Sequence, residues 1–160
     1  MPILETDNYI TLHDKLKNIG AELLVKTLDK MLEGNLERTV QPSGESYAPM
    51  INKEMTKLDF SKNSNEIFNF VRGLSPFPGT YMIDSDNKRY KVYDVKTIEK
   101  DDIDSNIENG TVFSIEKDTL SIKCNNGLVN IVLIQPENSR KMDISDFLKS
   151  SKLKVGDILK

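Results

Sequence analysis

The sequence predicts an α+β fold made of an N-terminal helix, a polar linker and a small β-barrel with short flanking helices. Three observations predict it. Residues 11–33 repeat apolar side chains at helical spacing, and residues 34–52 are polar and broken by Gly and Pro. From Gly79 onward, short segments alternate apolar and polar residues, which is the period of a β-strand.

The helix over residues 11–33 is expected to begin with Thr11 as its cap, with Asp14 completing a capping box. Gly34 is expected to end it. Its leucines form a broad apolar stripe that is unfavourable in water. We therefore expect the helix to pack on the barrel or on a neighbouring molecule, including a second copy of the chain through the apolar face of residues 11–33.

A second helix is expected over residues 64–72, capped by Ser61 or Asn63. It leads into Arg72-Gly-Leu-Ser-Pro-Phe-Pro-Gly79. Gly73 suits a left-handed position just past a helix end, and the two prolines forbid further helix and predict a stiff, extended turn around Phe77.

The strands are expected in the C-terminal half, followed by a short helix over residues 144–149. The segments with strand character are 81–84, 89–95, 111–115, 120–124 and 129–134. Turn residues separate them, including an Asn-Gly pair that is typical of hairpins. Five or six short strands with a helix at the edge favour a barrel of the oligonucleotide-binding (OB) type.

Composition restricts the classes of function. The chain has 160 residues, of which 38% are hydrophobic and 29% charged, and no apolar run is long enough to predict a membrane span. The single cysteine, Cys124, is expected to be a buried strand residue in a reducing, cytoplasmic compartment. A net charge of −3 argues against non-specific nucleic-acid binding by the whole chain but allows a local basic surface.

No catalytic, cofactor-binding or metal-binding residues are predicted. His13 is the only histidine, and neither zinc-ligand spacing nor a Gly-rich phosphate loop is present. Binding of a partner is therefore the class of function that remains. The residues that could reach phosphates, if they are not simply solvated charges, are Lys53, Lys57, Lys88, Arg89, Lys91, Arg140 and Lys141. Tyr81, Tyr90 and Tyr93 could stack on bases or belong to the core.

Several motifs, in order along the chain, carry a resemblance to a known family. They are Leu12-His-Asp-Lys-Leu, Gly20-Ala-Glu-Leu-Leu, Tyr47-Ala-Pro, Asn52-Lys-Glu, Leu58-Asp-Phe, the Arg72–Gly79 turn, Met142-Asp-Ile-Ser-Asp-Phe-Leu and Leu153-Lys-Val-Gly-Asp. Together they resemble the C-terminal half of methionyl-tRNA formyltransferases.

The resemblance implies a tRNA-binding role. In that family a Rossmann-like domain transfers a formyl group from 10-formyltetrahydrofolate to methionyl initiator tRNA, and its catalytic residues would all precede Met1. Residues 1–33 would be the last strand and helix of that domain, residues 34–52 the linker, and residues 53–160 the OB-like domain that helps bind tRNA. The chain alone would then have no transferase activity.

Two positions depart from the family pattern. Lys53 matches the lysine of the Lys-Glu linker motif, whereas Met50 stands where a second lysine is common. Phe77 replaces Trp or Tyr, a change expected to conserve shape and burial. Alternative interpretations are the matching part of a sugar N-formyltransferase or of a formyl-folate dehydrogenase, or a non-catalytic OB-type interaction domain.

Overall fold

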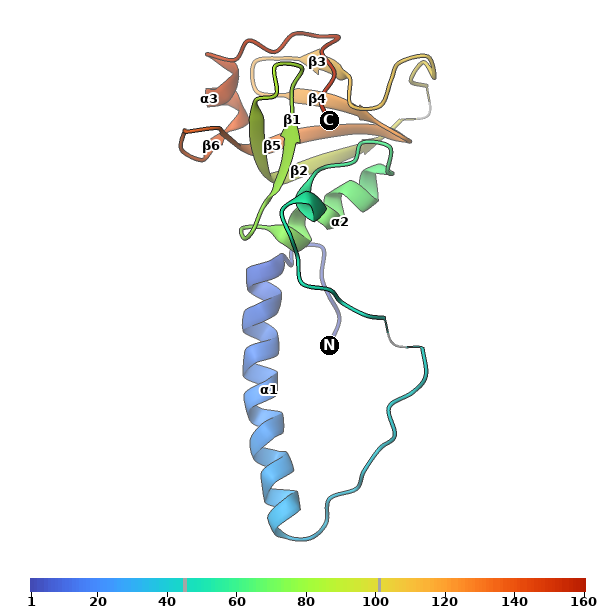
Figure 1. Ribbon diagram of the computed structural model, residues 1–160, viewed down its shortest axis with the longest axis vertical. Coiled ribbons are helices and arrows are strands. Elements are labelled where there is room, and N and C mark those ends of the chain that lie inside the picture. The colour runs from blue at the N-terminus through green and yellow to red at the C-terminus, as the bar shows by residue number, and fades with distance from the viewer. Residues whose placement is uncertain (45, 101) are drawn as a thin grey trace. The chain divides into compact units, whose positions relative to one another are not determined.

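The computed structural model describes residues 1–44, 46–100 and 102–160 (Figure 1). The chain divides into two compact units, Met1–Ile51 and Asn52–Lys160. Glu45, which belongs to the expected linker, lies outside the described residues.

The first unit contains the long helix α1, Tyr9–Leu32. It begins earlier than expected because Asn8, not Thr11, is the cap. The Asn8 Oδ1 accepts the Thr11 N–H at 3.0 Å, and the Thr11 Oγ1 accepts the Asn8 N–H at 2.9 Å. Thr11 is thus the reciprocal member of the capping box, the place assigned to Asp14 from the sequence. At the other end Gly34 adopts φ +73°, the left-handed conformation expected just past a helix.

The strand expected before this helix is absent among residues 1–8, which form a turn instead. The Asp7 N–H donates to the Leu4 carbonyl at 3.0 Å, and the Asp7 Oδ2 accepts the Leu4 N–H at 2.9 Å. The Lys15 ammonium donates to the Asp7 Oδ1 at 2.6 Å and is the main reason why the pKa of Asp7 is lowered. These local hydrogen bonds take the backbone groups that a strand would need for a neighbouring strand.

No residue of α1 is buried. Its apolar stripe is exposed, and the side chain of Leu23, for example, is 62% exposed. None of the helices in the described ranges has both the length and the hydropathy required to cross a membrane.

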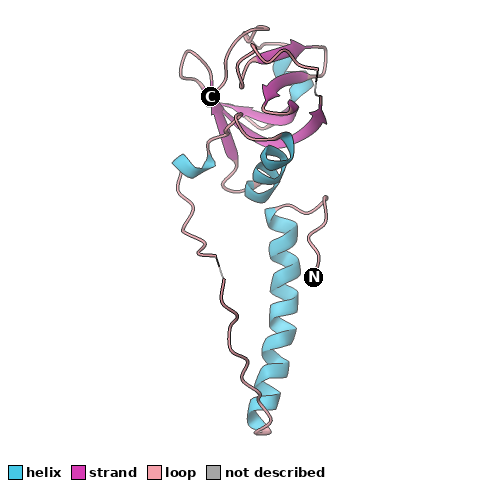
Figure 2. Ribbon diagram, turned by 90° about the vertical axis from the view of Figure 1, so that its right-hand side faces the viewer, coloured by secondary structure: helices cyan, strands magenta, loops and turns pink. Residues whose placement is uncertain are grey.

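The second unit is built on an antiparallel sheet. Its strands are β1 (Thr80–Ile83), β2 (Arg89–Glu99), β3 (Val112–Ile115), β4 (Leu120–Cys124), β5 (Gly127–Pro136) and β6 (Met142–Asp143). The order is β1-β2-β5-β4-β3, with β6 paired to β5 (Figures 1 and 2). The α+β class, the β1–β2 hairpin and the three later strands predicted from the sequence are therefore confirmed, and the sheet is open along its path.

The C-terminal tail hydrogen-bonds to both outer strands of this sheet. The Ile83 N–H donates to the Lys160 carbonyl at 2.6 Å, and the Lys160 N–H donates back at 2.8 Å. On the other side, the Leu159 N–H donates to the Gly110 carbonyl at 2.8 Å and the Val112 N–H donates to the Asp157 carbonyl at 2.7 Å. The tail therefore links β1 to the beginning of β3.

Helices border the sheet. A short 3-10 turn, η1 (Glu54–Thr56), precedes α2 (Ser64–Leu74), which contacts β2, and α3 (Ile144–Leu148) follows β6. Asn63 is the cap of α2, and its N–H donates to the Glu66 carboxylate at 3.0 Å.

The predicted end of the second helix was wrong. Gly73 lies inside α2 and has no positive φ. The helix ends at Leu74 because Ser75 precedes Pro76 and takes an extended conformation. The turn that follows is compact, closed by a hydrogen bond of 2.8 Å from the Gly79 N–H to the Leu74 carbonyl.

The core lies between α2, α3 and the inner face of the sheet. Its fully buried side chains are Val71, Met82, Val92, Val95, Val112, Leu120, Ile122, Val129, Ile131, Ile134 and Leu159. Cys124 is also fully buried, as predicted, and burial raises the pKa of its thiol. The tail residue Leu159 belongs to this core, so the tail is part of the folded unit.

Candidate functional site

Register brings four polar and aromatic residues into one row across the outer face of the sheet. Lys57 forms a parallel bridge with Tyr81 of β1, Tyr81 pairs with Lys91 of β2, and Lys91 pairs with Gln135 of β5. Residues directly opposite one another on neighbouring strands project from the same face. Two lysines therefore flank Tyr81 on this face.

Arg89 adds a third cation to the row. It is two residues before Lys91 on β2, hence on the same face. Its guanidinium carbon lies 4.4 Å from the centroid of the Tyr81 ring. The stack fixes the orientation of the guanidinium, whose remaining N–H groups can donate to an anion.

Lys141 is held over a second ring of this face. Its ammonium lies 3.7 Å from the centroid of Tyr93. The Tyr93 hydroxyl donates to the Gln135 Oε1 at 2.8 Å, and the Gln135 Nε2 donates to the Ser139 carbonyl at 2.8 Å. Tyr93 and Gln135 thus tie the loop that carries Lys141 to the sheet.

We call this surface the cationic face, defined by Lys57, Tyr81, Arg89, Lys91, Tyr93, Gln135 and Lys141. Four of the seven predicted basic residues are brought together there, each resting on or beside a ring. A cation over an aromatic ring gains about 0.5–1 kcal/mol at an exposed site, which is enough to favour one orientation. Arg89 and Lys141 are therefore held over rings, and no carboxylate among the described residues forms an ion pair with any of the four cations.

The other three predicted basic residues are exposed, and no contact within the described ranges links them to this face. Lys53 lies at the N-terminal end of η1. Lys88 is 3.7 Å from the Asp86 carboxylate, in the β1–β2 turn. Arg140 contributes, after Lys149, to lowering the pKa of Asp146.

The three candidate tyrosines are all largely buried. Tyr90 belongs to the core, where its ring meets Phe147 edge-on at 5.6 Å between centroids. Tyr81 and Tyr93 are each 8% exposed and lie beneath Arg89 and Lys141. The face therefore presents cations, rather than exposed aromatic rings, to a partner.

Sequence reasoning missed Gln135 and the pairing of cations with rings. The alternation Arg89-x-Lys91-x-Tyr93 within one strand could have placed these three residues on one face. The expected burial of Phe77 was wrong: its side chain is 72% exposed at the turn between Pro76 and Pro78. Phe77 lies in the turn over residues 75–78, between α2 and β1.

The described part of the chain holds no group of His, Cys, Asp and Glu side chains that could bind a metal ion. His13 is an exposed residue of α1, with its Nδ1 3.3 Å from the Asp14 carboxylate.

Residues 50–152 match the family described as formyl transferase, C-terminal domain. The chain belongs to this family. Among curated relatives, methionyl-tRNA formyltransferase of Lactococcus lactis subsp. lactis (strain IL1403) is 38% identical over 159 residues, which are 98% of this chain and 49% of the relative. The enzyme of the same name from Caldanaerobacter subterraneus subsp. tengcongensis is 41% identical, over 99% of this chain and 50% of the relative. The chain thus spans about half the length of these relatives.

Solved structures of HypX from Aquifex aeolicus share the fold of this chain. One variant of HypX aligns with 94% of this chain and 27% of its own, with a TM-score of 0.61 at 14% identity. HypX in complex with tetrahydrofolic acid aligns with 84% of this chain and 26% of its own, with a TM-score of 0.52 at 16% identity. At these identities the likeness concerns the fold alone.

Proposed function

We propose that this chain is the C-terminal, tRNA-binding part of a methionyl-tRNA formyltransferase that works in the cytoplasm. The observation that carries the proposal is the cationic face, where Lys57, Arg89, Lys91 and Lys141 meet on one side of the sheet. The two relatives described above are methionyl-tRNA formyltransferases, which supports tRNA as the partner.

The role of the face is to position initiator tRNA. Lys and Arg contacts to phosphates fix the register and orientation of a nucleic acid without reading its sequence. A few such contacts on a chain of net charge −3 give weak, salt-sensitive binding. Orientation of the methionyl end is then the contribution to catalysis, because a correctly placed amino group reacts with a smaller entropic cost.

The formyl group is supplied by 10-formyltetrahydrofolate, bound by a separate catalytic portion. In this arrangement residues 1–33 are the last part of the catalytic domain, residues 34–52 are the linker and residues 53–160 form the tRNA-binding domain. The boundary between the two compact units, which falls after Ile51, supports this division. The purified chain is expected to show no formyl transfer, and measurable turnover with methionyl-tRNA and 10-formyltetrahydrofolate would contradict this.

We assign the second unit to the OB type as a partly open barrel. The C-terminal tail, hydrogen-bonded to Ile83 on one side and to Gly110 and Val112 on the other, supports this assignment. The outer face of β1 and β2 then serves as the binding surface.

The apolar stripe of α1 is assigned to a protein contact with the catalytic portion. Its exposed leucines, among them Leu16, Leu23 and Leu28, would cause an isolated chain to associate with itself. Sedimentation velocity would show a concentration-dependent dimer, which Leu23→Glu should abolish; a strict monomer at all concentrations would rule out the self-association.

Binding of tRNA at two salt concentrations tests the main proposal. The chain is titrated into labelled initiator tRNA at about 50 and 200 mM salt and compared with Lys57→Met, Lys91→Met and the double variant. Each lost phosphate contact should weaken binding and reduce the slope of log K against log salt by about 0.7–0.9. Lys117→Met, an exposed lysine in the β3–β4 turn, is the matched control. Equal effects of all three lysines, or no salt-sensitive binding at all, would refute the assignment of the cationic face.

A further inference from the structure

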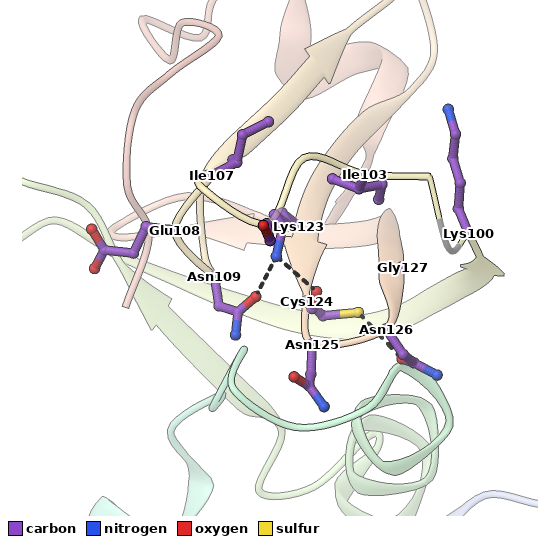
Figure 3. A pocket seen from close by; sticks show the side chains of 11 residues that line it. Lys100, Ile103, Ile107, Glu108, Asn109, Lys123, Cys124, Asn125, Asn126 and Gly127 are labelled. Atoms are coloured by element: carbon purple, nitrogen blue, oxygen red, sulfur yellow. Dashed lines mark hydrogen bonds between the residues drawn. The ribbon is translucent and has the colours of Figure 1, made fainter.

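A cavity of about 620 Å³ lies between the segment that follows β2 and the β4–β5 turn. Figure 3 shows its lining, to which the segment after β2 contributes Ile103 and Ile107 and the β4–β5 connection contributes Cys124 to Gly127. This volume falls in the range of small-molecule sites, about 300–1,000 Å³. None of the residues of the cationic face lines it.

The cavity contains a buried lysine. Lys123 is only 7% exposed, although lysine is almost never buried without a partner of opposite charge. Its ammonium donates to the Asn109 Oδ1 at 2.8 Å and, at the outer limit of 3.5 Å, to the Cys124 carbonyl. Both acceptors are neutral.

No carboxylate pairs with this ammonium among the described residues. Glu108 also lines the cavity but is exposed, and Figure 3 shows its carboxylate directed away from Lys123. An ammonium has three N–H groups, and the described residues provide acceptors for two of these. Among the described residues the cavity thus holds a positive charge with no carboxylate partner and with one N–H donor to spare.

The asparagines of the cavity add donors. The Asn109 Oδ1 is taken by Lys123, and the Asn126 Oδ1 is taken by the Ser64 N–H at 2.8 Å. Each of these side chains therefore keeps its NH₂ group for another partner. Lys100 also lines the cavity, and its ammonium lies 5.7 Å from the centroid of the Phe113 ring. Asn125 differs, because its Nδ2 donates to the Asn63 Oδ1 at 2.8 Å and its oxygen is left as an acceptor. The donors of Lys123, Asn109 and Asn126 suit an acceptor-rich anion.

We propose that this cavity binds a phosphate group, with the Lys123 ammonium as its central contact and the Asn109 amide beside it. A phosphate offers several strong acceptor oxygens and a charge that compensates the buried ammonium. The group can come from free phosphate or from a nucleic-acid backbone. This inference does not rest on the proposed function, since its residues are different.

Amide chemical shifts of the ¹⁵N-labelled 160-residue chain test the site. The chain is titrated at constant ionic strength with inorganic phosphate in one series and with an initiator tRNA transcript in a second, phosphate-free series. We expect saturable shifts at Asn109 and at residues 123–127. Lys123→Met should abolish them, whereas the exposed Lys117→Met should leave them unchanged.

Asn109→Asp keeps the experiment decisive if Lys123→Met does not fold. It preserves the acceptor for Lys123 but places a carboxylate where the anion would sit, so phosphate binding should weaken about tenfold or more while the fold is kept. Saturable shifts with inorganic phosphate would identify a free-phosphate site, and shifts with tRNA alone, lost in Asn109→Asp, would identify a backbone phosphate. Shifts that survive in Asn109→Asp, or no shifts in either series, would overturn the proposal.

Discussion

The Arg89 guanidinium carbon lies 4.4 Å from the centroid of the Tyr81 ring, on neighbouring strands of the outer sheet face. The Nε of Arg89 is buried and has no hydrogen-bond partner among the described residues. The contact with the Tyr81 ring therefore helps to hold this cation in place. Within the proposed interface it keeps one charge oriented before any nucleic acid arrives.

Arg89→Lys should lower stability although it keeps the charge, because an ammonium on a flexible stem cannot reproduce the planar stack. We expect a loss of about 0.5–1 kcal/mol in the free energy of unfolding. Urea unfolding of Arg89→Lys, Tyr81→Leu and the double variant would measure the coupling between the two side chains. Strictly additive losses would show that the stack contributes nothing.

Gly79→Ala should destabilise the second unit and disturb the Tyr93–Lys141 pair. Gly79 has φ +79°, and a Cβ there would lie 2.9 Å from the Tyr93 Cε1. Left-handed backbone alone costs an alanine about 1–2 kcal/mol. The matched control is Gly73→Ala, inside α2 with no atom within 4 Å of the added carbon, which should instead stabilise by about 0.5–1 kcal/mol. Thermal unfolding of the two variants should shift in opposite directions; a shift in the same direction would contradict the assigned backbone conformations.

Stability should fall at alkaline pH because of Tyr90. Its burial, and then its hydrogen bond of 2.8 Å to the Asp84 carboxylate, raise the pKa of the phenol in the folded state. As the pH passes about 10, the unfolded chain releases this proton before the folded chain does. The stabilisation by neutral Tyr90 is therefore complete below pH 10 and is lost progressively above it.

Tyr90→Phe removes this titration and isolates its effect. The variant should lose about 1–2 kcal/mol at pH 7 through the missing hydrogen bond, and its stability should decline less steeply above pH 10. Tyr47→Phe, an exposed tyrosine, is the control and should match the unchanged chain. Parallel stability curves for Tyr90→Phe and the unchanged chain would disprove the role of this group. Chemical unfolding at pH steps from 7 to 11.5 makes the comparison.

The strands and the cores of the helices could be predicted because their patterns are local. The alternation in 89–95 and the Asn-Gly turn at 126–127 fix β2 and the β4–β5 hairpin without reference to distant residues. The helix boundaries failed for local reasons too. Asn8 competes with Thr11 as a cap, and the residue before Pro76, not Gly73, sets the end of α2.

The candidate site could be predicted only as a set of basic residues. That Lys57, Lys91 and Gln135 share a row depends on strand order and register, which no pattern in one strand reveals. The burial of Lys123 depends on the segment after β2 covering it, a contact that residue types alone do not indicate. The sequence therefore indicated the chemistry of each residue but not which distant residues pair with one another.

Leu159→Ala should weaken the second unit more than any change at the exposed end of the tail. Leu159 is 1% exposed and belongs to the core, while its N–H donates to the Gly110 carbonyl. Truncating a buried leucine costs about 2–5 kcal/mol, through lost burial and the cavity that remains. The nearby Val155→Ala, with a 63% exposed side chain, should change stability by less than about 0.5 kcal/mol. Urea unfolding of the two variants measures the difference. A small loss of unfolding free energy for Leu159→Ala would mean that the tail is not part of the cooperative unit. It would also mean that the hydrogen bonds linking β1 to β3 do not survive in solution.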